Sequence, residues 1–563
     1  MKRLAAARGE LGVAALLALA VLLQFGHTLD AYWRGDDTAI LAHALSETLP
    51  AIFFEPAAWQ RLSTANLTPW LSLSFALDAA LGGIETPWLF RLHQLGALAG
   101  LLTTLWLCWR RRCGDRLALL LTLLFAAGLP TAHLAAELMT RHYLEGLWLS
   151  LLAWLCYRRA RERASLPWLL AAAAAYALAC SAKEIYVPLL LWLTWVEALD
   201  LQQRGWQAWR PALQRLLPFL LVAAAYVLWR RAMLPSLAGG YADSSRWLEP
   251  AYLRQVLAAL VRLPVLLFGA ATPLFLLAAL LPLLLYLRAQ PAYVLTLGVG
   301  AALVLLPLVP LVAYPGLQAP DRYLWLPWFA LVAALVKPLA ALRQPAGGTA
   351  LATRRNLLWP AAAGLLLLLT LAQRSASRSD DAGQQAADLQ LRFAWQQGSG
   401  VALEPDAALA ATFWQLQGLA TLKQRAHGGD LPVLVFDDED LPTGLPLYRY
   451  EVSCHCMADI SASVPARREA ARAIRDDDSP LSVALQNRDG LLSWQFGPAT
   501  SGQWQVLLQG LGRLPLPPGE AGLRTTLRAP LQLRVRHLAE DGRVSSTPLL
   551  TLPPDGSVLQ WSR

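Results

Sequence analysis

Two adjacent carboxylates, Asp36 and Asp37, follow Arg34 and Gly35 directly after the first apolar run of the chain. Adjacent carboxylates can hold a divalent cation such as Mg²⁺ or Mn²⁺, or one of them can act as a general base. The same residues could also form an ordinary solvated turn. We take the pair as the catalytic candidate and Arg34 as a substrate-pocket candidate, and we expect that no metal ion is required.

A second group of ionisable residues lies between 133 and 145. Glu137, Arg141 and Glu145 are spaced four residues apart, which predicts that they share one face of a helix. A self-neutralising ion ladder at a helix end would have the same spacing. His133 and His142 could bind a metal, although polar capping of a helix end is the simpler explanation.

A lysine lies between two apolar stretches in the sequence Ser181–Ala182–Lys183–Glu184. At this position Lys183 could bind a phosphate group as a point charge. Alternatively, its side chain could extend toward the membrane surface and pair with Glu184. The loop is too short to form a solvated surface, which favours the phosphate role.

An arginine, Arg322, precedes another apolar run that begins Tyr323–Leu324–Trp325. An arginine and the N-terminus of a helix together form a site for an anion. Tyr323 and Trp325 could be aromatic residues of the membrane interface. That explanation suffices for Trp325 but leaves Arg322 unexplained.

Two further segments carry weaker signals. Tyr241, Asp243 and Arg246 form a polar group, and 252–263 has the apolar spacing of an amphipathic helix at a membrane surface. Cys454–His455–Cys456 could be half of a metal site, a disulfide or a pair of free thiols, and its spacing is too tight for ordinary zinc chelation.

The composition requires membrane helices to position these residues. Hydrophobic residues make up 56% of the 563 residues and charged residues only 15%, whereas a soluble domain carries about 25% charge. Runs of about 17–25 apolar residues predict membrane spans. We expect about eleven spans: 11–29, 88–109, 117–134, 142–157, 166–181, 185–199, 214–233, 264–287, 291–314, 323–342 and 356–373.

The arginines between these runs predict the orientation of the chain. Most of them lie in alternate loops, such as 110–116 and 158–163, which places the N-terminus inside and the C-terminus outside. No small-residue cleavage site follows the first run, so we expect an uncleaved helix. The same distribution explains the net charge of +9 without nucleic acid. In this orientation, all the candidate clusters face the outer side.

The polar segment 374–563 predicts a separate periplasmic domain, α+β or β-rich toward its end. It opens with a linker and a helix over about 380–425, and 433–436, 504–508 and 531–535 are expected strands.

The order of short motifs resembles the GT-C glycosyltransferase superfamily, in particular the TMTC-type protein O-mannosyltransferases and their bacterial relatives. The resemblance covers about residues 1–340. It is carried by the acidic pair, Asn66–Phe75, Gly82–Gly83, Arg91–Gln94, Pro130 with Glu137 and Arg141, Ser181–Glu184 with Pro188, and Arg322–Pro327.

The resemblance implies an inverting transfer of a sugar from a polyprenyl-phosphate donor on the outer side of a bacterial inner membrane. Asp36 or Asp37 would be the base, and Lys183, Arg322 and Arg141 would bind the donor phosphate. The acceptor could be a protein, a lipid or a glycan, and membrane lipid is the other expected partner. Substrate-pocket candidates are Arg34, His133, Glu137, His142, Glu184, Tyr241, Asp243 and Tyr323.

The sequence departs from the family pattern in three places. No arginine precedes Pro69, an extra alanine separates Ser181 from Lys183, and 374–563 has no helical repeats. The acceptor of the TMTC proteins is therefore not carried over. A lipid-linked-sugar flippase or transporter, and a non-catalytic membrane assembly subunit, are the alternatives.

Overall fold

The computed structural model describes most of the chain and divides it into two units. The described residues are 2–235, 249–305, 307–308, 322–343, 364–372, 381–405, 413–476, 478–488, 491–508, 512–517, 519–524, 531–553 and 556–563. One unit comprises Met1–Ala31 with His43–Ser379, and the other Tyr32–Ala42 with Asp380–Arg563. This boundary lies close to the predicted 373/374, except that Tyr32–Ala42 groups with the C-terminal unit.

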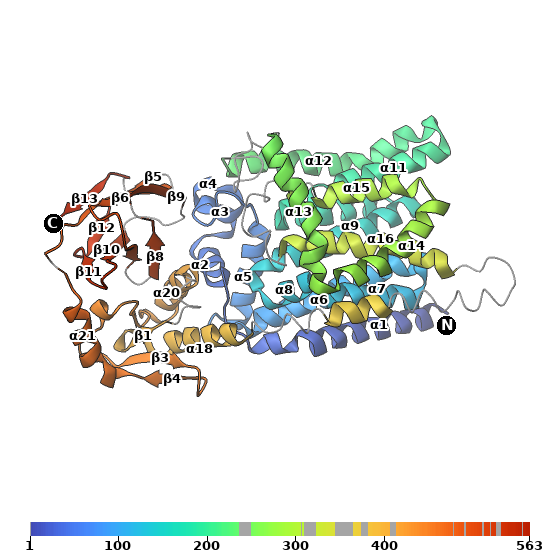
Figure 1. Cartoon of the computed structure of the whole chain (residues 1–563). Helices are drawn as coiled ribbons and strands as arrows, with labels where there is room; N and C mark the ends of the chain where they lie inside the picture. The colour runs from blue at the N-terminus through green and yellow to red at the C-terminus, as the bar shows by residue number, and fades with distance from the viewer. Residues whose placement is uncertain are drawn as a thin grey trace. The chain divides into compact units, whose positions relative to one another are not determined.

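The larger unit is helical (Figure 1). Its helices are α1 (Lys2–Phe25), α3 (Leu49–Phe54), α4 (Pro56–Gln60), α5 (Pro69–Gly82), α6 (Trp88–Cys113), α7 (Asp115–Ala127), α8 (Leu129–Ala136), α9 (Arg141–Arg163), α10 (Leu166–Ala182), α11 (Leu189–Arg204), α12 (Trp209–Met233), α13 (Pro250–Phe268), α14 (Thr272–Ala289), α15 (Tyr293–Leu305) and α16 (Trp325–Arg343). Helix α2 (Asp37–Ser46) has residues in both units.

Six described helices are long and apolar enough to cross a membrane, or seven if one bent pair is counted as a span. This confirms an integral membrane protein, while the number eleven and the orientation stay predictions. Helices α10 and α15 are apolar but shorter. Half of the predicted span 356–373 lies outside the described residues, and the described half, 364–372, is helical.

The predicted span 117–134 is a bent pair of helices. Helices α7 and α8 meet at Gly128 with an angle of 62°. Gly128 packs directly against the Trp328 indole, and a Cβ at this position would overlap the ring. The Trp328 Nε1 donates to the Phe125 carbonyl oxygen at 2.9 Å, which satisfies an acceptor released by the bend.

The segment 250–289 also differs from the prediction. The expected span 264–287 joins the end of α13 to α14, but the chain breaks at Gly269, which has a positive φ of 50°. The predicted helix over 252–263 is present within α13, which is itself long and apolar enough to span, and its place at the membrane surface stays a prediction. A single apolar run in the sequence therefore conceals two helices.

The C-terminal unit begins as an α/β structure. Helix α18 (Asp381–Gln397), strand β1 (Ala402–Glu404) and helix α20 (Phe413–His427) replace the single helix predicted over 380–425. Strands β2 (Val433–Leu434), β1, β3 (Leu447–Glu451) and β4 (Cys456–Asp459) form a sheet in that order, parallel except for the β3–β4 pair. Helix α21 (Val464–Ala473) follows this sheet in the chain.

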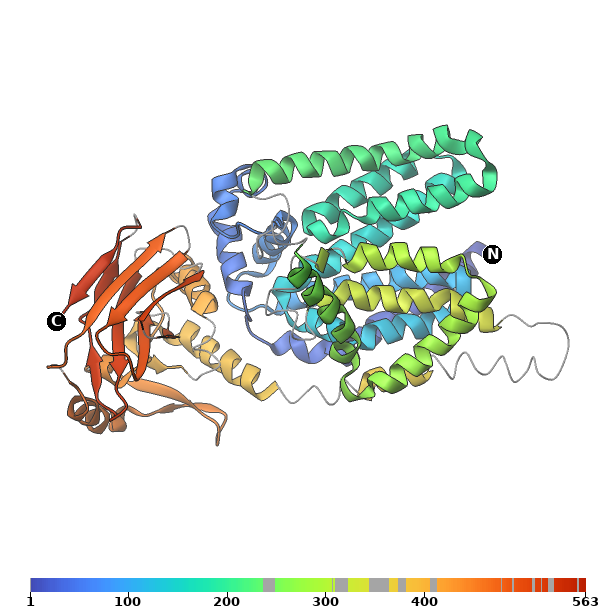
Figure 2. The same cartoon turned by 45° about the horizontal axis from the view of Figure 1, so that its top comes forward.

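The end of the chain is β-rich, as predicted, and Figure 2 shows its strands. One sheet has the order β11 (Val544–Ser546), β10 (Leu531–Leu538), β7 (Gln503–Leu508) and β8 (Gly512–Leu516), with β12 (Leu550–Leu552) also on β10. The second has the order β13 (Leu559–Ser562), β5 (Ser482–Arg488), β6 (Leu491–Gly497) and β9 (Gly519–Arg524). Both contribute to one core, which includes Val483, Trp494, Trp504 and Val535, so the sheets form a sandwich.

Candidate active site in the membrane unit

Lys183 is a buried cation between helices α10 and α11. Its residue is extended, and its side chain is 6% exposed. The Nζ donates to Asn66 Oδ1 at 2.9 Å, lies 3.5 Å from Glu184 Oε1 and lies 5.4 Å from the centre of the Tyr143 ring. The predicted pairing with Glu184 is therefore present, but Lys183 also contacts Asn66, a residue of another motif.

A second cation, Arg230 near the end of α12, belongs to the same cluster. It donates to the Ala65 carbonyl oxygen at 3.0 Å and approaches Glu184 Oε2 at 3.9 Å. Sequence reasoning missed this residue. The signal was present, because Arg230 and Arg231 end a predicted span on the outer side, where arginines are few.

The electrostatic environment of Lys183 reflects these neighbours. Burial lowers the pKa of the Lys183 ammonium, and the positive charges of Arg322 and Arg230 act in the same direction. Glu184 opposes them by stabilising the charged form. The influence of Arg322 indicates that the charges of Lys183 and Arg322 act on each other, while their role as phosphate ligands stays a prediction.

Arg322 and His142 complete this group, which we call the lysine cluster: Lys183, Glu184, Arg230, Arg322 and His142. The Arg322 guanidinium lies 5.2 Å from the centre of the Tyr323 ring and 4.0 Å from Met139 Sδ. His142 is buried, and its Nδ1 has no hydrogen-bond partner among the described residues. A buried polar atom in this state can bind a ligand atom at little desolvation cost.

Two aromatic residues beside Arg322 pack inside the protein. Trp325 is 1% exposed, lies 4.8 Å from the Phe125 ring and donates to the Tyr143 carbonyl oxygen at 3.2 Å. Tyr323 is also buried. The interface explanation of Trp325 is therefore wrong, because an interface residue would expose its ring to the lipid.

Arg141 lies in a different centre, in which every nitrogen of its guanidinium has a partner. Its donors reach Gln94 Oε1 at 3.3 Å, Ser74 Oγ at 2.9 Å, Asp78 Oδ2 at 2.6 Å and the Phe90 carbonyl oxygen at 2.6 Å. The side chain is fully buried. Binding a donor phosphate would require Arg141 to break these contacts.

His93 joins the same centre to Glu145. Its Nδ1 lies 2.8 Å from Asp78 Oδ1 and its Nε2 lies 3.3 Å from Glu145 Oε1. Glu145 also accepts from Trp70 Nε1 at 2.7 Å. We call Arg141, Asp78, His93, Glu145 and Gln94 the arginine network. Sequence reasoning missed Asp78, although a lone carboxylate within the apolar helix α5 is a signal of a buried partner.

The predicted helical face of Glu137, Arg141 and Glu145 is wrong for Glu137. Helix α8 ends at Ala136, Glu137 is extended, and α9 begins at Arg141. Glu137 Oε2 instead lies 3.2 Å from His133 Nε2, within one turn of α8. The two residues therefore pair with each other, which is neither metal binding nor capping of a helix end.

The acidic pair lies in the C-terminal unit. Asp37 is buried, and its Oδ2 accepts from the Arg34 backbone N–H at 2.9 Å, while Asp36 is exposed. The Arg34 side chain pairs with Asp388 of helix α18 at 2.9 Å and donates to Gln384 at 2.7 Å. Asp37 therefore holds the turn.

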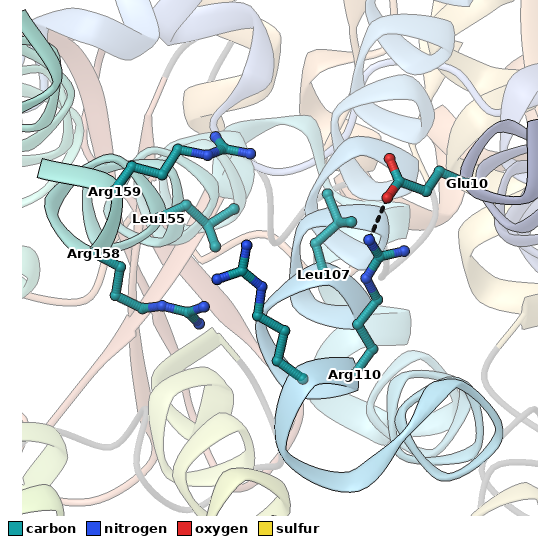
Figure 3. Close-up of a pocket in the computed structure, with 7 residues that line it drawn as sticks. Glu10, Leu107, Arg110, Leu155, Arg158 and Arg159 are labelled. Carbon is teal, nitrogen blue, oxygen red and sulfur yellow. Dashed lines mark hydrogen bonds and ion pairs between the residues drawn. The ribbon is translucent and has the colours of Figure 1, made fainter. Parts of the chain in front are cut away.

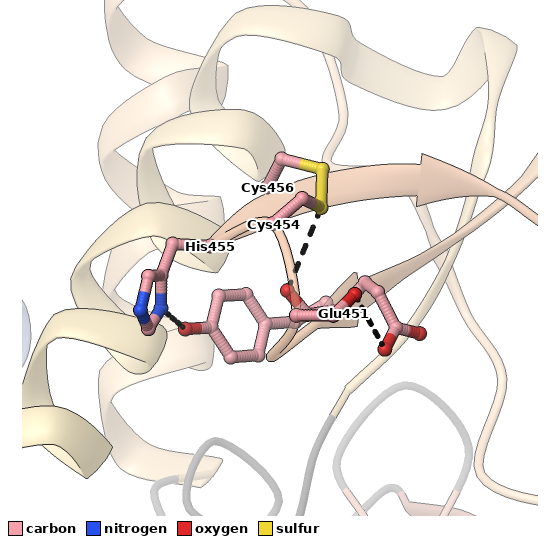
Figure 4. Close-up of a disulfide and its surroundings, with 6 residues drawn as sticks. Glu451, Cys454, His455 and Cys456 are labelled. Atoms are coloured by element: carbon pink, nitrogen blue, oxygen red, sulfur yellow. Dashed lines mark hydrogen bonds between the residues drawn. A yellow bond between two sulfur atoms is a disulfide. The ribbon is translucent and has the colours of Figure 1, made fainter.

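Two other groups of predicted residues have different outcomes. Tyr241 and Asp243 lie outside the described residues. Cys454 and Cys456 form a disulfide, and His455 Nδ1 lies 3.0 Å from Tyr450 Oη (Figure 4). Among the residues that the structure describes, no three His, Cys, Asp or Glu side chains gather as metal ligands.

A cavity of about 170 Å³ lies at the other end of α9 (Figure 3). It is lined by Glu10, Leu107, Arg110, Arg111, Leu155, Arg158 and Arg159. The 17 residues from Arg141 to Arg158 span about 25 Å of helix. The cavity is therefore separate from the lysine cluster and the arginine network.

Comparisons with known proteins give two structural relatives. No protein-family model and no curated protein matches the chain. It is similar to the crystal structure of ArnT from Cupriavidus metallidurans bound to undecaprenyl phosphate, with 15% identity, 84% of this chain and 93% of that chain covered, and a TM-score of 0.39. The apo ArnT structure gives 14% identity, coverages of 85% and 93%, and the same TM-score.

Proposed function

We propose that this chain is a GT-C-type inverting glycosyltransferase that moves a sugar from a polyprenyl-phosphate donor to an acceptor hydroxyl. The observation that carries the proposal is the lysine cluster, in which Lys183 and Arg230 lie near the Glu184 carboxylate and Arg322 acts electrostatically on Lys183.

The chemistry explains why such a cluster is needed. The bond between the sugar C1 and the phosphate oxygen breaks, and the phosphate leaves with the electron pair and an added negative charge. Cations held in a site without water stabilise that charge strongly, because they need no reorganisation during the reaction. Lys183 and Arg322 are the proposed phosphate ligands, and the buried Nδ1 of His142, which has no hydrogen-bond partner among the described residues, is the third proposed contact to the substrate.

The acceptor side of the reaction requires a base. The acceptor oxygen forms the new bond to C1 on the opposite face and loses its proton to a carboxylate. Asp36 is the proposed base, on the grounds of its place in the sequence and its exposure. The acceptor, whether a protein, lipid A or a surface glycan, would be met on the outer side of the inner membrane, where we place the C-terminal domain.

The test is transfer of radiolabel from polyprenyl-phosphate sugars to candidate acceptors by the purified full-length chain. We expect transfer by the parent chain and its loss in Asp36→Asn. Asp37→Asn should also destabilise the turn between Arg34 and Asp37, and the temperature of thermal unfolding should fall. Full activity in both variants would remove the acidic pair from the mechanism.

A second candidate function is a lipid-linked-sugar flippase or transporter. The bent pair α7–α8 favours it, because transporters often contain broken helices at membrane depth. Proteoliposomes that move a fluorescent polyprenyl-phosphate sugar between leaflets, without sugar transfer to any acceptor, would support this function and contradict the first.

A further inference from the structure

The cavity at the end of α9 is built from converging arginines. Arg110 and Arg111 lie in the last turn of α6, and Arg158 and Arg159 lie near the end of α9. All four line one cavity, together with Glu10 of α1 (Figure 3). Two helices, α6 and α9, thus bring four guanidinium groups to one place, although like charges repel each other.

The carboxylates near the cavity do not balance these charges. Glu10 pairs with Arg110, and Glu162 lies 3.0 Å from Arg111 and 3.8 Å from Arg158. Arg159 stacks over the Trp168 ring at 5.0 Å and has no carboxylate partner within the described parts of the chain. Two carboxylates therefore face four arginines, and the site would gain stability from a bound anion.

The environment of Arg158 shows the same excess of positive charge. Its side chain is 16% exposed. Burial lowers the pKa of its guanidinium, and the positive charge of Arg111 acts in the same direction. An anion that bound between the two helices would relieve both effects.

The walls of the cavity indicate where the anion comes from. Leu107 and Leu155 form its apolar side. On the adjoining helix α1, Leu11, Leu19 and Leu23 are exposed on a helix that is apolar enough to span the membrane. A phosphate in the cavity could therefore continue into acyl chains that lie along these leucines.

We propose that this cavity binds the phosphate group of an anionic membrane phospholipid. Arginine binds phosphate through parallel hydrogen bonds, and basic pockets between membrane helices are suited to anionic headgroups. The arginines of the cavity have two simpler explanations. Their positive charge stabilises the C-terminal ends of helices, and arginines in inside loops orient the chain in the membrane. Neither role requires the arginines to converge on one cavity.

The experiment measures lipid binding by the full-length chain in detergent, with native mass spectrometry and thermal unfolding. The probes are dioleoylphosphatidylglycerol, dioleoylphosphatidylcholine and inorganic phosphate. The variant is Arg158→Gln with Arg159→Gln, and the matched control is Arg204→Gln with Arg210→Gln, which removes two positive charges away from the cavity. Arg158→Lys with Arg159→Lys keeps the charge and tests the guanidinium geometry.

We expect phosphatidylglycerol, but not phosphatidylcholine, to bind and to raise the unfolding temperature of the parent chain and the control. Binding should be about 20-fold weaker in the double glutamine variant, since each arginine near the surface contributes roughly fivefold. The lysine pair should keep part of the affinity. Equal binding by the glutamine variant and the control would overturn the proposal, and saturation by inorganic phosphate without lipid binding would overturn the lipid assignment.

Discussion

The lysine cluster and the arginine network lie near the same ends of the membrane helices. They differ in how many of their polar groups have a hydrogen-bond or ion-pair partner within the protein. In the arginine network, Arg141 has a protein partner at every guanidinium nitrogen, and Asp78 and Glu145 share His93. In the lysine cluster, Lys183 and Arg230 share Glu184, the charge of Arg322 is stabilised by Glu137, and a buried nitrogen of His142 has no partner among the described residues.

This difference separates a structural centre from a functional one. A buried ion pair with a complete set of partners stabilises one arrangement of helices, here α5, α6 and α9, and offers nothing to a substrate. A buried cluster with excess positive charge is costly without a ligand, and such groups are concentrated at binding sites. We therefore infer that the lysine cluster binds the donor and that the arginine network holds the helices in place.

The largest expected effect is on stability, in the arginine network. Arg141→Met would leave Asp78 charged and buried without its main partner, which should lower the free energy of unfolding by about 3–5 kcal/mol. Thermal unfolding in detergent measures this loss. The activity of each molecule that remains folded should be largely kept. If Arg141→Met unfolds like the parent chain but no longer transfers sugar, Arg141 belongs to the active site instead.

The next effect is on catalysis, in the lysine cluster. Lys183→Met should lower the rate of sugar transfer about 10²–10³-fold, because it removes a charge that stabilises the leaving phosphate. Thermal unfolding should change little, since Glu184 retains Arg230. Lys337→Met, in helix α16, is the matched control and should transfer normally. Equal loss of activity in both variants would indicate a general effect on the membrane helices.

A pH profile sharpens the assignment of Lys183. The ammonium is charged below its pKa, and burial lowers that pKa from the ordinary value of about 10.4. Donor binding should therefore weaken as the pH rises through the lowered pKa, by up to about tenfold per pH unit. Measurement of KM for the donor against pH reveals this limb. Lys183→Arg should remove it, because arginine stays charged, and persistence of the limb in that variant would assign it to another group.

Hydropathy predicted most of the membrane helices because each helix carries a long apolar surface within its own sequence. It failed where a distant residue decides the local structure. The bend at Gly128 depends on Trp328, 200 positions later, which local composition cannot identify. The break at Gly269 has a local signal, because Thr272 donates to the Gly269 carbonyl oxygen and Pro273 lies in the first turn of α14, but hydropathy gives these residues no weight.

The same limit applies to the sites. Lys183 and Arg322 were found because a charge between apolar segments is costly and so requires a reason. Their roles could not be separated from that of Arg141, since the decisive fact is the presence of Asp78 and Gln94 around Arg141. The resemblance to GT-C enzymes supplied the order of the motifs, but the contact between Asn66 and Lys183 is visible only in the fold.

The smallest expected effect concerns His142 and tests the comparison most directly. His142→Leu should change the free energy of unfolding by less than about 1 kcal/mol, because the lost packing is offset by removal of a buried nitrogen without a partner. Gln94→Met, in the arginine network, should cost about 1–3 kcal/mol, because it leaves the Arg141 Nε unpaired. Thermal unfolding of both variants under the same condition shows which one loses more stability. The KM for the donor should rise only in His142→Leu. If His142→Leu is the more destabilised variant, the lysine cluster is a structural centre as well, and its incomplete hydrogen bonding is no sign of a substrate.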